Sequence, residues 1–151
     1  MPKGFSLIET LVVVGMLALL ASVSMVVGVQ AFSRSSVKDD RDLLVGVLQK
    51  ARSEAMHDVC TTEGCVGPSA FGVHINSREI VLFEGTSYNP QDSHSESFVA
   101  ESAATHFSGT SNIVFAATSG DAASTSITVS NGTEVVSTVT IGTLGQISWS
   151  Y

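Results

Sequence analysis

A long uncharged stretch near the start of the chain limits the possible folds more than any other feature. No Asp, Glu, Lys, Arg or His occurs from Thr10 to Ser33. About 20 helical residues are enough to cross the ~30 Å hydrocarbon core of a bilayer. A segment in lipid must be helical, because all its backbone groups have to be hydrogen-bonded internally. The stretch therefore predicts a helix of membrane-spanning length.

One acid, Glu9, directly precedes this stretch, and Lys3 is the nearest base. A secretory signal peptide is one interpretation, since ALLAS resembles a small-residue cleavage site, although MPKG is a very short basic start. A plain membrane anchor is a second interpretation. It leaves Glu9 unexplained, because a carboxylate at membrane depth is costly and usually functional.

A third interpretation explains the acid. The string KGFSLIE, followed by an apolar run, closely resembles the processing signal of type IV pilins and type II secretion pseudopilins. The resemblance implies that a prepilin peptidase cleaves between Gly4 and Phe5 and methylates the new N-terminus at Phe5. It also implies that Glu9 faces the positive Phe5 amine of a neighbouring filament subunit. In an apolar core each of these charges alone would be very costly.

The helix is expected to continue to about residue 59, because no proline interrupts residues 5–58. Its second half carries apolar residues at helical spacing, which predict one face that packs against the rest of the chain. These packing residues are Val37, Leu44, Leu48, Ala51 and Ala55. The charges of this half are expected to form a solvated face. The block LLVGVLQKARSEAM also resembles the end of the helix in the GspH/FimT branch of the pilin family.

The remaining residues read as a β-rich head. Short runs rich in Val, Ile, Phe and Thr alternate with turn signals. Residues 71–75 and 79–85 predict two strands of a tight hairpin through NSR, and Asn131-Gly132 signals a second hairpin, compatible with a type I′ turn. Further strands are expected within 98–102, 112–120, 124–130, 133–141 and 146–151, with a turn at Gly142–Gly145.

Six to eight strands after one long helix predict an α+β fold. The resemblance implies the pilin-like version, in which the helix packs on an antiparallel sheet or sandwich. The expected organisation is a leader at 1–4, a membrane or filament-core helix at 5–33, its amphipathic continuation at 34–59, and a globular head at 60–151.

Two cysteines, Cys60 and Cys65, lie just after the predicted helix. In an exported chain such a pair favours a disulfide, and a loop this short would stabilise the fold by about 2 kcal/mol. A zinc site with His57 and His74 is an alternative, but the spacing matches no standard zinc motif. Free thiols are the third possibility, and no metal or other cofactor is expected.

The charge distribution argues against nucleic-acid binding. The chain has 14 acids and seven bases, and none of the bases follows Arg78. Nucleic-acid binding depends on cationic contacts with phosphates, so the second half is a poor candidate. No nucleophile elbow, phosphate-binding glycine loop or paired acid–base spacing occurs, and we therefore expect no enzymatic activity.

The resemblance as a whole implies a minor type IV pilin or type II secretion pseudopilin. Such a protein crosses the bacterial inner membrane once, with its head in the periplasm, and then enters a pilus or pseudopilus. The implied partners are other pilins, the prepilin peptidase and the inner-membrane assembly platform. Two alternatives stay open: a FimT-like minor pilin that binds DNA during natural transformation, and a filament-displayed adhesin that binds through the loop TSYNPQDSHSES.

Overall fold

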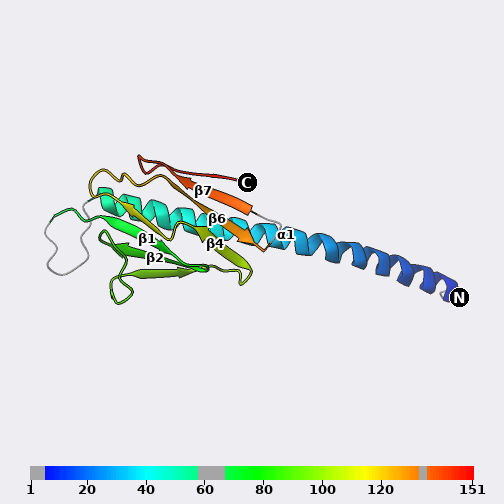
Figure 1. Ribbon diagram of the computed structural model, residues 1–151. Helices are drawn as coiled ribbons and strands as arrows, with labels where there is room; N and C mark the ends of the chain where they lie inside the picture. The colour runs from blue at the N-terminus through cyan, green and yellow to red at the C-terminus, as the bar shows by residue number, and fades with distance from the viewer. Residues whose placement is uncertain (1–5, 58–66, 133–135) are drawn as a thin grey trace. The chain divides into compact units, whose positions relative to one another are not determined.

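The computed structural model describes residues 6–57, 67–132 and 136–151, except for the side chains of residues 23–34. One long helix, α1 (Leu7–Met56), precedes the strands in the chain (Figure 1). Eight strands follow in the described part: β1 (Phe71–Ile75), β2 (Glu79–Glu84), β3 (Glu96–Val99), β4 (Thr105–Gly109), β5 (Asn112–Phe115), β6 (Thr125–Asn131), β7 (Val136–Ile141) and β8 (Ile147–Ser150). The chain divides into two compact units, residues 1–35 and 36–151.

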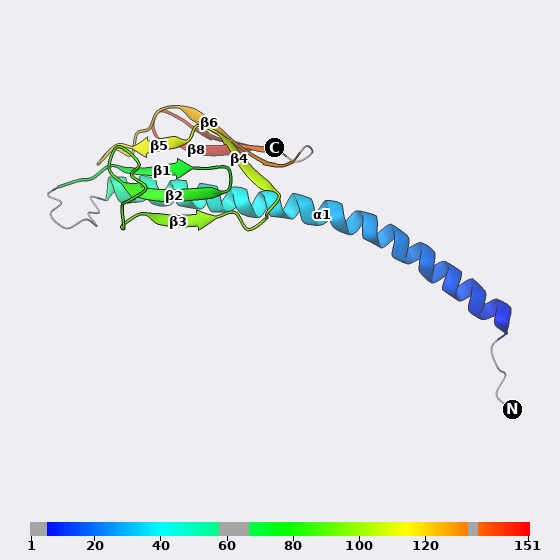
Figure 2. The same ribbon diagram turned by 60° about the horizontal axis from the view of Figure 1, so that its bottom comes forward.

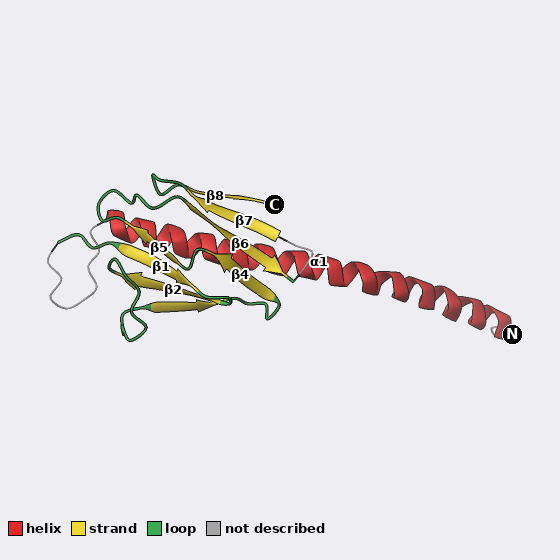
Figure 3. Ribbon diagram, viewed as in Figure 1, coloured by secondary structure: helices red, strands yellow, loops and turns green. Residues whose placement is uncertain are grey.

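The strands of the second unit form two four-stranded antiparallel sheets. Their strand orders are β3-β2-β1-β5 and β4-β6-β7-β8. Both sheets lie along the C-terminal stretch of α1, as the two views in Figures 1 and 2 show. Figure 3 distinguishes the helix from the strands by colour, and all the strands follow the helix in the sequence. The predicted α+β fold with antiparallel sheets is thereby confirmed.

A core fills the space between α1 and the two sheets. Every residue that the sequence assigned to helix–head packing is fully buried: Val37, Leu44, Leu48, Ala51 and Ala55. They join inward-facing strand residues such as Val73, Phe115 and Val139 in one apolar cluster. Successive side chains of a strand point to opposite faces of the sheet, and β6 follows this rule. Its Ile127 and Val129 are buried in the core, whereas the residues on either side of them are partly or fully exposed. Burying each such side chain contributes about 1.5–3 kcal/mol.

The outer face of the first sheet has its own cover. Gly72 of β1 pairs with Phe83 of β2, and a Cβ at Gly72 would lie within 2.8 Å of Phe83 Cε1. The Phe83 ring therefore packs directly on the glycine, and it is 2 % exposed although it stands apart from the core cluster. Tyr88, from the segment after β2, has its ring 5.7 Å from that of Phe83. This segment thus covers part of the outer face.

The predicted β1–β2 hairpin is confirmed. Ile75 pairs with Ile80, and the Asn76 N–H donates to the Glu79 carbonyl at 2.8 Å. The turn before the last strand is confirmed as well, since the Gly145 N–H donates to the Gly142 carbonyl at 2.9 Å.

Three details differ from the sequence-based expectations. Strand β4 was not expected, because THFSG has few β-branched residues and contains a glycine. Strand β3 begins earlier than the run at 98–102 suggested. The β6–β7 hairpin exists, but a two-residue type I′ turn is wrong, because Ser130 pairs with Val136 rather than Thr133. Pairing across a longer connection keeps Val129 and Ile127 on the buried face.

Candidate functional site

The first unit presents an apolar helix that has no core of its own. Every described side chain from Ser6 to Ser22 is exposed. The large apolar ones are Leu7, Ile8, Leu11, Val12, Val13, Val14, Met16, Leu17, Leu19 and Leu20. A helix that is apolar on all sides is normally buried in a larger assembly or in a membrane. This segment therefore needs partners from outside the described chain.

Its few polar groups are satisfied within the helix. The Thr10 hydroxyl donates to the Leu7 carbonyl at 2.9 Å, and the Ser22 hydroxyl donates to the Leu19 carbonyl at 2.8 Å. These bonds lower the cost of moving the hydroxyls away from water. In the part of the chain that the structure describes, no helix is both long and apolar enough to cross a membrane.

One face of this helix carries a shallow depression. Leu7, Thr10, Leu11 and Val14 border this wide-open groove of about 310 Å³. Their spacing of three, one and three residues places them on a single helical face. Grooves between such rows accept the side-chain ridges of a second helix. The groove is thus suited to helix–helix packing.

Glu9 lies in the first turn of α1 and is exposed. An acid in this position interacts favourably with the positive end of the helix dipole. The predicted cleavage site, Gly4 and Phe5, lies outside the described residues. Cleavage there, methylation, and pairing of Glu9 with a neighbouring amine accordingly stay predictions.

The predicted cysteine site is also outside the described residues, since both Cys60 and Cys65 fall within 58–66. Each of the two histidines considered as zinc ligands has other neighbours. His57 Nδ1 lies 2.7 Å from the Ser53 carbonyl oxygen. His74 Nδ1 lies 2.7 Å from Asn112 Oδ1, and its ring stacks on Tyr88 at 4.1 Å. Among the described residues there is no group of three or more potential metal ligands.

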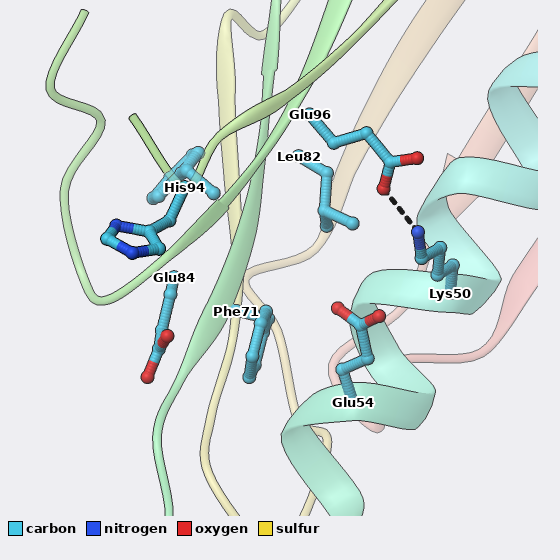
Figure 4. Close-up of a pocket in the computed structure, with 8 residues that line it drawn as sticks. Lys50, Glu54, Phe71, Leu82, Glu84, His94 and Glu96 are labelled. Atoms are coloured by element: carbon cyan, nitrogen blue, oxygen red, sulfur yellow. Dashed lines mark hydrogen bonds and ion pairs between the residues drawn. The ribbon is translucent and has the colours of Figure 1, made fainter. Parts of the chain in front are cut away.

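A hollow of about 230 Å³ lies between α1 and the first sheet (Figure 4). Its charged rim includes Lys50 and Glu54 of α1, and Glu96 of β3. Lys50 and Glu96 form an ion pair that links the helix to the strand, and this bond to Glu96 raises the pKa of Lys50. The pKa of Glu54 is raised mainly because burial disfavours its charged form, with added repulsion from Glu96 and Glu84.

Three bases in the C-terminal half of α1 have partners within the second unit. Arg41 pairs with Asp42 at 2.6 Å, Lys50 pairs with Glu96, and Arg52 donates to the Leu144 carbonyl at 3.1 Å. These partners reduce the positive charge that is available to phosphates, so the geometry adds nothing in favour of DNA binding.

The loop considered for adhesion is held by local bonds. The Tyr88 ring packs on His74, and Asp92 accepts a hydrogen bond from the His94 N–H at 3.0 Å. This backbone bond lowers the pKa of Asp92. Such contacts give the loop a defined shape, but they identify no ligand.

The sequence-based reading missed the burial of two charged residues in α1, Asp40 and Arg41. Asp40 Oδ1 accepts a hydrogen bond from the Glu101 N–H at 2.7 Å. The Arg41 guanidinium lies over the rings of Trp149 and Tyr151. The sequence did carry a signal for this burial. Asp40 and Arg41 follow the buried Val37 by three and four positions, and residues at that spacing share a helical face.

The architecture matches a solved structure. The crystal structure of the type IV minor pilin FimU from Pseudomonas aeruginosa (strain PAO1) is similar to this chain, with a TM-score of 0.57. The fold is pilin-like. The match covers 81 % of this chain and 90 % of FimU at 12 % sequence identity, so the likeness is one of fold. No family model matches the sequence. No curated protein sequence matches it either.

Proposed function

We propose that this protein is a structural subunit of a type IV pilus or type II secretion pseudopilus, of the GspH/FimT-like minor kind. The observation that carries the proposal is an exposed apolar helix in the same chain as a pilin-like head. The head buries its own core, whereas the helix can bury its apolar surface only against other molecules. A filament made from side-by-side helices meets that requirement.

In this proposal the subunit first resides in the bacterial inner membrane. The uncharged stretch from Thr10 to Ser33 crosses the bilayer, and the head lies on the periplasmic side. The assembly platform then moves the helix from lipid to a bundle of similar helices. Lipid tails are as apolar as the helix surface, so the gain comes from close packing and from pairing of polar groups.

Glu9 supplies such a polar pairing. Its carboxylate is the one charge among residues 6–22, and it is exposed. Opposite the Phe5 amine of a neighbouring subunit, both charges would be compensated away from water. The pairing would also fix the axial register between adjacent helices.

The processing step provides the test. The full chain is co-expressed with an active prepilin peptidase, and its intact mass is measured. We expect a mature chain that begins at methylated Phe5. The matched control, Gly4→Val, should keep its full length, because the peptidase recognises the glycine at the end of the leader. A wild-type chain that retains residues 1–4 while a known prepilin is cleaved in the same cells would refute the proposal.

A further inference from the structure

The hollow between α1 and the first sheet carries an excess of negative charge. Three carboxylates line it, those of Glu54, Glu84 and Glu96, whereas Lys50 is its one lysine or arginine. Lys50 offsets one of these charges through its ion pair with Glu96. Figure 4 shows the Glu54 carboxylate turned toward this pair. We call this site the acidic hollow.

The carboxylates of the acidic hollow repel one another. The pKa of Glu54 is raised mainly by burial. The attraction of Lys50 lowers this pKa, and repulsion from Glu96 and Glu84 raises it. A second cation placed among these groups would be attracted by all three carboxylates and would offset their repulsion. The electrostatics of the hollow therefore favour a positively charged ligand.

The size and the apolar wall of the acidic hollow narrow the kind of cation. Its volume of about 230 Å³ is below the roughly 300–1,000 Å³ of ordinary small-molecule pockets, so it suits a single side chain. Phe71 and Leu82 supply apolar lining beside the acids. A guanidinium binds carboxylates and stacks on aromatic rings, and the methylene groups of an arginine pack on apolar surface. An arginine side chain thus matches both parts of the lining.

The chain itself presents such an arginine. Arg78 lies in the turn between β1 and β2 and is exposed. The other bases of residues 36–151 have contacts with an acid, a carbonyl or a ring: Lys38, Arg41, Lys50 and Arg52. The Arg78 guanidinium has no such contact with any residue that the structure describes. It is therefore available to a partner.

Arg78 and the acidic hollow lie at opposite ends of the β1–β2 hairpin. Phe71 pairs with Glu84 at the end that borders the hollow, and Ile75 pairs with Ile80 beside the turn that holds Arg78. The four residue steps from Phe71 to Ile75 correspond to about 14 Å. Arg78 thus points to the hollow of another molecule. A contact between two different patches of identical subunits is heterologous, and it repeats into an open row when it does not close into a ring.

We propose that the acidic hollow binds the Arg78 side chain of a second copy of this chain, and that this head-to-tail contact orders successive heads in the filament. The inference rests on the filament role proposed above and adds a contact made by the head. The guanidinium binds the Glu54 carboxylate and packs on Phe71, while Lys50 keeps its bond to Glu96. Because the hollow is partly buried, salt screens this pair less than a pair on open surface.

Crosslinking from the neighbour of Arg78 tests the contact. Ser77 is exposed, so a photoreactive benzoylphenylalanine in its place probes the turn without removing the arginine. The full chain is expressed in two differently tagged forms together with its assembly machinery, and sheared filaments are purified and irradiated. We expect a product that carries both tags. Mass spectrometry should locate the crosslink between position 77 of one copy and the lining of the acidic hollow in the other.

Charge reversal shows whether this product depends on the proposed pair. Arg78→Glu and Glu54→Arg should each reduce its yield per chain in the filament by about tenfold, because like charges placed together cost several kcal/mol. The double variant Arg78→Glu/Glu54→Arg should restore the yield, since opposite charges meet again across the contact. Lys38→Glu is the matched control. It changes the net charge as Arg78→Glu does, and it should leave the yield as in the wild type.

The remaining outcomes separate this inference from the proposed function. A chain that enters filaments but crosslinks from position 77 to another pilin, or to a different face of its own copy, overturns the inference and leaves the filament role intact. The same holds if the double variant fails to restore the product, or if Lys38→Glu reduces it as much as Arg78→Glu does. A chain that is absent from filaments contradicts the proposed function, and the inference falls with it.

Discussion

Glu9 is the residue on which assembly depends most in our proposal. Replacing it by alanine removes the carboxylate that would compensate a neighbouring amine, and an uncompensated amine in an apolar core is very costly. We expect Glu9→Ala to be cleaved and to float with membranes like the wild type, but to be nearly absent from sheared filaments. Thr10→Ala is the matched control, since it removes an exposed polar group one position away whose bond is internal to the helix. Normal incorporation of Glu9→Ala would contradict the pairing.

Glycines of the head provide a residue-scale test of the fold. A Cβ at Gly72 would lie within 2.8 Å of the buried Phe83 ring, whereas a Cβ at Gly46 of α1 would meet nothing within 4 Å. Gly72→Ala should therefore destabilise the head by about 1–3 kcal/mol through overpacking. Gly46→Ala should stabilise it by up to about 1 kcal/mol, because alanine has the higher helix propensity. Thermal unfolding of the two variants measures the difference, and equal melting temperatures would contradict the close packing of β1 on Phe83.

At the scale of the elements, the Glu54 carboxylate makes the stability of the contact between α1 and the first sheet depend on pH. Its pKa is raised by burial and by nearby Glu96 and Glu84, so the folded state disfavours the ionised form. Ionised Glu54 therefore destabilises the folded state at every pH above its folded-state pKa. This destabilisation disappears as the pH falls below the pKa of Glu54 in the unfolded chain, about 4.3. Glu54→Gln should raise the melting temperature at pH 7 and lose that advantage toward pH 4. An advantage that is independent of pH would rule out this electrostatic origin.

Periodic patterns predicted the elements well where burial controls them. The steps from Val37 to Ala55 anticipated the buried face of α1, and alternation anticipated β6. Patterns failed where long-range pairing decides, as in β4, which forms by pairing with β6 although its own sequence has weak strand propensity. The same limit applies to the functional surfaces. The apolar helix and Glu9 can be read directly from the sequence, whereas the acidic hollow joins Lys50 and Glu96, which are 46 positions apart.

At the scale of the whole molecule, the two units differ in how their apolar surface is buried. Residues 36–151 have a core that closes on itself, whereas residues 6–22 expose nearly continuous apolar surface. The head thus has a core of its own, whereas the apolar helix can be covered only by molecules outside the described chain. In our proposal these molecules are first lipid and then other subunits. This combination suits a subunit that is stored in one environment and used in another.

The overall charge leads to a prediction about DNA. With 14 acids against seven bases, and with Arg41 and Lys50 paired to carboxylates, the protein should repel a polyanion. We expect no retardation of double-stranded DNA in a gel shift at low salt, the condition that favours electrostatic binding most. A DNA-binding pilin run in parallel is the positive control. Salt-sensitive binding by this chain would support the DNA-uptake alternative instead.

The presence of the protein in a filament is the most direct test of the central claim. Filaments are sheared from cells that express the tagged chain with its assembly machinery, purified, and probed for the mature protein. We predict that the chain beginning at Phe5 copurifies with the filaments and disappears from that fraction when the assembly ATPase is inactivated. A mature chain that stays wholly in the membrane fraction, while the same cells release intact filaments, would contradict its role as a filament subunit.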